Sequence, residues 1–82
     1  MSVAEEVIAT IRAVTNDPEV AVDRELKLFE LQILDSLRTV ELVVALSERF
    51  DVEIALSEID RSLWATPNLI IAFIENRVGV RV

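Results

Sequence analysis

The chain has 82 residues, 52% of them hydrophobic, with one Gly and two Pro, a composition that is typical of one packed domain and unlike that of a disordered chain. The absence of Cys and His excludes disulfides, the common structural zinc sites, cysteine nucleophiles and histidine general bases. The formal net charge of −7 disfavours nucleic acid and anionic membrane surfaces and favours partners with basic patches. We therefore expect a single domain over residues 1–82, with neither nucleic acid nor metal as a ligand.

The N-terminal segment predicts a helix that begins after Ser2. Ser2 and Glu5 have the spacing of a capping box. Asn16-Asp17-Pro18 ends the helix, because Pro disfavours helical backbone in the residue before it. One apolar stripe runs along the segment, formed by Val3, Val7, Ile8, Ile11 and Val14.

The same segment also bears on location. Glu5 and Glu6 stand where a signal peptide carries positive charge, and no apolar run reaches membrane-spanning length. We expect a cytoplasmic protein without membrane insertion.

From Glu19 to Leu34 neither a helical nor an alternating period persists. Loops of this length in small domains either carry function or pack by their own side chains. The apolar residues spaced along this one predict that it packs against the core.

A second helix is predicted from about Ser36 to Phe50, where apolar residues cover about half of the helical circumference. The apolar arc comprises Leu37, Val40, Val43, Val44, Leu46 and Phe50, and a narrow polar stripe comprises Arg38, Glu41, Ala45 and Glu48. So wide an arc indicates contacts with more than one neighbour. Two interpretations of Leu37, Val40 and Val44 stay open: core packing or contact with a partner.

The last third of the chain predicts an extended connector over residues 51–56 and two further helices. Ser57-Glu58-Ile59-Asp60 resembles a capping box that opens a short helix through Leu63 or Trp64. Thr66 and Pro67 form an N-cap followed by Pro at the first helical position, and Gly79 ends this last helix. The fold class is therefore all-α: a small helical bundle of three main helices plus one short helix, with a long first loop.

Ser36 stands out as the candidate functional residue. At a helix N-terminus its hydroxyl lies beside unpaired backbone N–H groups and the positive end of the helix dipole, a favourable place for a phosphate. Asp35 supplies either an N-cap or a carboxylate that faces a metal on a modifying enzyme. The alternative is that Asp35 and Ser36 only cap the helix, and position and composition leave the two interpretations open.

A resemblance favours the first interpretation. Asp35-Ser36-Leu37, then Thr39-Val40-Glu41-Leu42-Val43 and Phe50-Asp51-Val52-Glu53-Ile54, resemble the second helix of acyl carrier proteins and the segment after it. The run from Ile59 to Asn68 resembles the D-alanyl carrier protein branch, with its Asp-Arg and its Trp shortly before Thr-Pro. Leu28-Phe29-Glu30 fits that branch too, so the likeness covers residues 28–74.

The resemblance implies a function for these residues. It implies that Ser36, between Asp35 and Leu37, receives 4′-phosphopantetheine from coenzyme A through a phosphopantetheinyl transferase. An adenylating acyl or aminoacyl ligase then loads an acid on the arm's thiol, and a downstream acyl-transfer or condensing enzyme takes it. The chain itself performs no catalysis, and we expect it to be a monomer.

Two positions depart from the carrier pattern. Gln32 stands where carriers commonly have Gly, and Arg38 stands where the carriers of fatty-acid synthesis usually have an acid. The reversed charge at Arg38 disfavours the partners of primary fatty-acid synthesis.

We expect partner docking along the second helix and the segment that follows it. The expected docking residues are Arg38, Val40, Glu41, Val44, Glu48, Ile59 and Trp64. Glu41 and Glu48 lie on the same helix as Ser36 and can steer basic partners, although solvated charge is the usual meaning of such a stripe. For Trp64, a packing anchor is the simpler interpretation.

The function expected from the sequence is a free-standing acyl or aminoacyl carrier in a specialised biosynthetic pathway. One alternative is a D-alanyl carrier for the esterification of teichoic acid. The other is an unmodified helical adaptor that binds a partner through an amphipathic groove.

Overall fold

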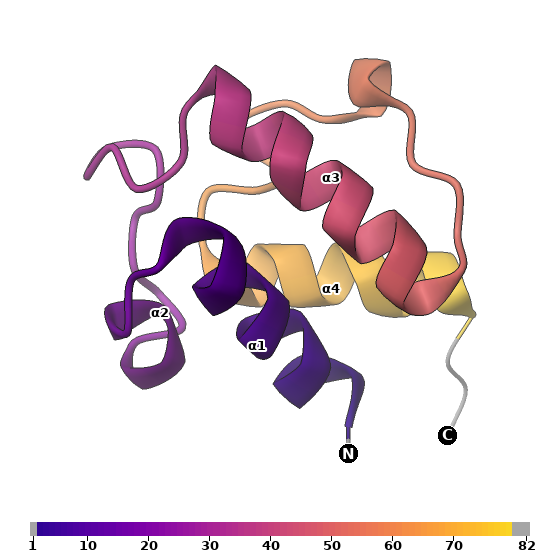
Figure 1. Ribbon diagram of the computed structural model, residues 1–82, viewed down its shortest axis with the longest axis horizontal. Coiled ribbons are helices and arrows are strands. Elements are labelled where there is room, and N and C mark those ends of the chain that lie inside the picture. Colours follow the sequence, from indigo (N-terminus) through magenta and orange to yellow (C-terminus); the bar gives the residue numbers. More distant parts are fainter. Residues whose placement is uncertain (1, 80–82) are drawn as a thin grey trace.

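The computed structural model describes residues 2–79 of the chain, so the expected domain of residues 1–82 extends beyond the described range at both ends. Within that range the chain is all-helical and contains no strand, which confirms the predicted fold class (Figure 1). The elements in chain order are α1 (Val3–Thr15), α2 (Glu19–Val22), α3 (Ser36–Phe50), the 3₁₀ helix η1 (Leu56–Glu58) and α4 (Pro67–Val78). None of the helices in residues 2–79 is long and apolar enough to cross a membrane.

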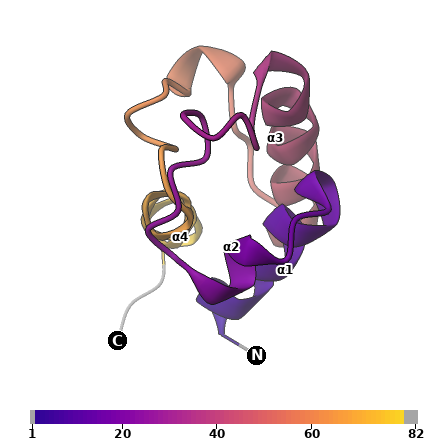
Figure 2. The same cartoon turned by 90° about the vertical axis from the view of Figure 1, so that its left-hand side faces the viewer.

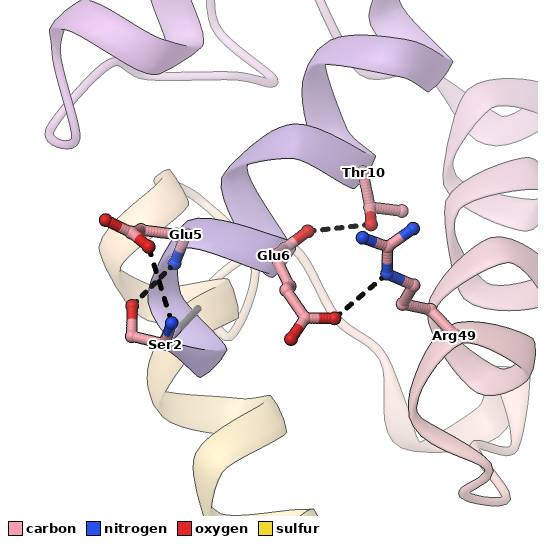
Figure 3. A network of polar contacts seen from close by, with 5 residues as sticks. All are labelled: Ser2, Glu5, Glu6, Thr10 and Arg49. Carbon is pink, nitrogen blue, oxygen red and sulfur yellow. Dashed lines mark hydrogen bonds and ion pairs between the residues drawn. The ribbon is translucent and has the colours of Figure 1, made fainter.

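The caps of α1 form as predicted. Figure 3 shows both bonds of the capping box: the Glu5 N–H donates to Ser2 Oγ over 3.1 Å, and the Ser2 N–H donates to the Glu5 carboxylate over 3.4 Å. At the other end Asn16 adopts the left-handed conformation, and its N–H donates to the carbonyl of Arg12. Arg49 of α3 pairs with Glu6 at 3.0 Å, an exposed contact between the two helices.

The segment expected to be a loop from Glu19 to Leu34 contains one helical turn, α2. Four residues are too few for a helical period to show in the sequence, so the expectation of no regular structure was wrong there. The rest of the segment is held to the core as predicted: the Leu28 N–H donates to the carbonyl of Ala65 at 2.9 Å, and Leu28 and Leu34 are buried.

The predicted short helix from Ser57 to Leu63 or Trp64 was also wrong. The structure has η1 one residue earlier and turns over residues 60–64. The Asp60 carboxylate accepts the N–H groups of Ser62 and Leu63, and such local bonds compete with helix formation. Glu58 bonds back to the Ala55 N–H at 3.1 Å, which places the start of the turn before Ser57.

One cluster of buried side chains joins the elements. Viewed along the molecule in Figure 2, α1, α3 and α4 surround the space that these side chains fill. Trp64 is fully buried and contacts Phe73 edge to face, with ring centroids 5.6 Å apart. The buried apolar residues are Val7, Ile8, Ile11, Val20, Leu28, Leu34, Leu42, Val43, Leu46, Trp64, Ile70, Ile71 and Ile74.

The burial along α3 makes a first prediction. Leu46 is fully buried and Val44 is 51% exposed. We expect Leu46→Ala to lower the free energy of unfolding by about 2–5 kcal/mol and Val44→Ala to change it by less than about 0.5 kcal/mol. Urea denaturation monitored by Trp64 fluorescence measures both. Similar losses in the two variants would contradict the orientation of α3.

Candidate functional site

Ser36 is the first residue of α3, and its side chain is exposed. Asp35 is the N-cap: its Oδ1 accepts the Arg38 N–H over 2.8 Å, and its carbonyl accepts the Thr39 N–H over 2.8 Å. The N-cap interpretation of Asp35 therefore holds in this structure.

The first turn of α3 leaves two donors available. Within residues 2–79 the N–H groups of Ser36 and Leu37 donate to no protein acceptor. Together with the helix dipole they favour negative charge at this end of α3. A phosphate ester on the Ser36 hydroxyl suits this position, and the chain has no His that could act as a general base for this hydroxyl.

Arg38 has a role that the sequence did not suggest. Its guanidinium Nη1 donates to the carbonyl of Thr15 at 2.7 Å and lies 3.5 Å from that of Val14, at the C-terminal end of α1. A cation there satisfies carbonyls that have no partner within the helix and complements the dipole of α1. The docking role expected for Arg38 stays a prediction, beside this contact that the side chain makes within the chain.

The approach to Ser36 contains a left-handed residue. Gln32 has a φ of 60°, a conformation that costs a non-glycine residue about 1–2 kcal/mol. The resemblance leads us to expect Gly at this position, and the backbone conformation found here is one that suits Gly, although the residue is Gln.

The exposed face of α3 includes an apolar strip formed by Leu37, Val40 and Val44, which are 67%, 39% and 51% exposed. The core interpretation of these residues was wrong, because Leu42, Val43 and Leu46 fill that role instead. An apolar strip that starts beside Ser36 and points to solvent is available for contact with another protein. Glu41 and Glu48 are exposed on the same helix.

The two expected docking residues outside α3 differ in exposure. Ile59 is half-buried against the core. Trp64 is 0% exposed, so its side chain cannot contact a partner protein, and its place among the docking residues was wrong. The packing interpretation of Trp64 agrees with its burial.

Two hollows meet at Ser36, and both are lined by Phe29 and Arg61. One, of about 180 Å³, extends toward Val40 and Leu56. The other, of about 310 Å³, includes Asp35. Phe29 and Arg61 were absent from the candidate residues, although both belong to segments that carry the resemblance.

The wall of the first hollow is held by two carboxylates. The Arg77 guanidinium pairs with Glu58 and is the main cause that lowers the pKa of this carboxyl, followed by the Ala55 N–H. The Ser62 hydroxyl, followed by the Leu63 N–H, lowers the pKa of Asp60. These contacts tie residues 55–63 to α4 and to each other.

The comparisons with known proteins agree with this site. Residues 5–74 match the family described as "Phosphopantetheine attachment site", and the chain belongs to this family of carrier proteins. It is accordingly a non-catalytic tether that carries 4′-phosphopantetheine covalently.

Within that family the chain is similar to proteins named D-alanyl carrier protein. The one from Listeria monocytogenes is 39% identical over 92% of this chain and 96% of the relative. The one from Lacticaseibacillus casei is 44% identical over 84% of this chain and 85% of the relative. The similarity thus spans most of this chain and most of each relative.

The contact of Arg38 with α1 makes a second prediction. Arg38→Ala removes the donor to Thr15 and should lower the free energy of unfolding by about 1 kcal/mol. The control is Arg24→Ala, an exposed arginine that follows α2 and whose loss should cost less than about 0.5 kcal/mol. Chemical denaturation of both variants measures the difference. If Arg38→Ala were no less stable than the control, the contact of Arg38 with the end of α1 would not contribute to stability.

Proposed function

We propose that this protein is a D-alanyl carrier whose arm is attached at Ser36. When bound, the phosphopantetheine arm supplies a thiol that holds an aminoacyl group as a thioester, which this chain cannot do with its own side chains because it has no Cys. The observation that carries the proposal is the exposed Ser36 at the first turn of α3, in a chain that is similar over almost its full length to D-alanyl carrier proteins. The similarity supports this cargo better than the specialised acyl pathway that the sequence suggested.

The proposed partners follow from this chemistry. A phosphopantetheinyl transferase modifies Ser36, an adenylating ligase activates D-alanine and loads the arm, and a downstream transferase takes the aminoacyl group, with teichoic acid as the proposed final acceptor. We place the protein in the cytoplasm as a monomer, where the ligase has ATP available. Tethering raises the effective concentration of the activated group for the transferase.

The exposed face of α3 is the proposed docking surface. Leu37, Val40 and Val44 provide apolar contact beside the arm, and Glu41 and Glu48 provide negative charge along the same helix. Charges at the edge of an interface act mainly on the association rate, whereas buried apolar groups contribute more to affinity.

Modification and loading form the third prediction. Incubation with coenzyme A and a transferase should add one phosphopantetheine mass to the wild type and none to Ser36→Ala. Ser57→Ala, an exposed serine of η1, should be modified like the wild type. The D-alanine ligase with ATP should then add one alanyl mass to the modified protein only.

Intact-protein mass spectrometry reads each step. An unmodified wild type would support the adaptor alternative, in which Ser36 is a plain helix residue. Modification without loading by D-alanine, together with loading of another acid by its own ligase, would reject the proposed cargo and keep the carrier function.

The fourth prediction concerns docking. Glu41→Lys and Glu48→Lys should each lower kcat/KM for loading by the ligase by up to about tenfold at low salt, with a smaller effect at high salt. Glu75→Lys makes the same charge change at an exposed site on α4 and serves as the control. Steady-state loading rates of the variants at two salt concentrations measure these effects. An equal loss for all three variants would show that net charge, and not docking on α3, controls the rate.

A further inference from the structure

Arg61 is the basic residue that lines the two hollows at Ser36. Three other arginines are committed to protein acceptors: Arg38 to the end of α1, Arg49 to Glu6 and Arg77 to Glu58. Arg61 forms no ion pair within residues 2–79, and its guanidinium lies over the ring of Phe29, with Cζ 5.3 Å from the ring centroid.

This arrangement keeps the guanidinium ordered without neutralising it. A cation over an aromatic face is attracted by the ring and stays charged. The planar guanidinium is also suited to binding phosphate oxygens in pairs, and a pre-oriented one loses less side-chain entropy on binding. The guanidinium of Arg61 is therefore held in a defined position and is available to bind an anion such as a phosphate.

Arg61 and Phe29 also lie where the hollows of this surface meet. Both line the two hollows that include Ser36, and both line a third hollow of about 360 Å³ that extends to Ala65 and Thr66. A group attached to Ser36 Oγ that extends into either adjacent hollow therefore enters a space that Arg61 and Phe29 help to line.

The charges around Ser36 indicate what Arg61 is placed to bind. The other charged residues in the two hollows at Ser36 are Asp35 and Asp60, both acidic, and Arg61 is the cation among the described lining residues. The phosphodiester that joins the arm to Ser36 adds another negative charge. Among the described residues that line these two hollows, Arg61 is the one that can offer a full positive charge to it.

We propose that Arg61, held on Phe29, binds the phosphodiester of the arm on Ser36 and keeps the apolar beginning of the arm against the Phe29 ring. This inference rests on the proposed attachment at Ser36. It assigns the pair a positioning role, which restricts the directions in which the arm leaves the protein before a partner takes it.

The test uses the modified protein and does not depend on loading. The wild type, Arg61→Gln and the control Arg12→Gln are modified with coenzyme A that is ¹³C-labelled in its pantetheine part, driven to completion and confirmed by intact mass. Arg12 is exposed on α1 and lines none of the three hollows. The readouts are nuclear Overhauser effects between the arm's geminal methyl groups and the Phe29 ring, and the ³¹P chemical shift.

In the wild type and in Arg12→Gln we expect these Overhauser effects and one shared ³¹P shift. In Arg61→Gln the Overhauser effects should be lost, and the ³¹P shift should move to that of a phosphopantetheinyl-serine peptide. Amide spectra of the core residues in the three proteins verify that each is folded.

Two outcomes overturn the inference. One is the absence of arm contacts with Phe29 in the modified wild type. The other is that the contacts and the ³¹P shift persist in Arg61→Gln. Failure of the wild type to gain the phosphopantetheine mass is a different result, which removes the proposed function itself.

Discussion

The first turn of α3 is held in place by contacts on two sides, and the arrangement of the site depends on this. Leu42, Val43 and Leu46 bury one side of the helix, and the guanidinium of Arg38 bonds the carbonyls at the end of α1. With the helix fixed this way, Ser36 remains exposed, and its backbone N–H group and that of Leu37 donate to no acceptor within residues 2–79. The residue proposed to carry the arm is thus presented on a rigid element, as positioning of a functional group requires.

These contacts also give the two sides of α3 different roles. Its inner side contributes to stability, and the exposed face formed by Leu37, Val40 and Val44 is left free, although these residues are as apolar as the core. Exposed valine and leucine cost little stability, so such a strip can be kept for recognition. A chain without Cys or His can in this way take part in covalent transfer chemistry, because the attached group contributes the reactive thiol and the chain contributes its position and the proposed docking surface.

The sequence predicted the elements whose ends depend on local contacts. The cap at each of these ends bonds residues only a few positions away, so it can be recognised in the sequence. The pair Ser2 and Glu5 marks the start of α1, Asp35 marks the start of α3, and α4 starts after Thr66 with Pro67 and ends at Gly79. The turn at Asp60 was missed, since its bonds to Ser62 and Leu63 compete with a helix of the same composition. The single turn of α2 is too short to show a period.

Contacts between distant residues could not be predicted in the same way. A helical wheel does not show which part of a wide apolar arc packs against other helices. The exposure of Leu37, Val40 and Val44 therefore follows only from the packing of α3 in the structure. The bond from Arg38 to Thr15 and the stacking of Arg61 on Phe29 join residues more than twenty positions apart. The periodicity of a segment gives no information about such distant pairs. The sequence therefore predicted a partner contact for Arg38 and gave no sign of its bond to Thr15.

The most direct test of the central claim is to locate the cargo on the wild-type chain. The protein is modified, charged with isotope-labelled D-alanine by the adenylating ligase, digested and sequenced by tandem mass spectrometry. We expect the labelled alanyl-phosphopantetheine on the peptide that contains Ser36, with fragment ions that place it on that residue. The arm on another serine, or labelled alanine bound to the chain without the arm, would contradict it.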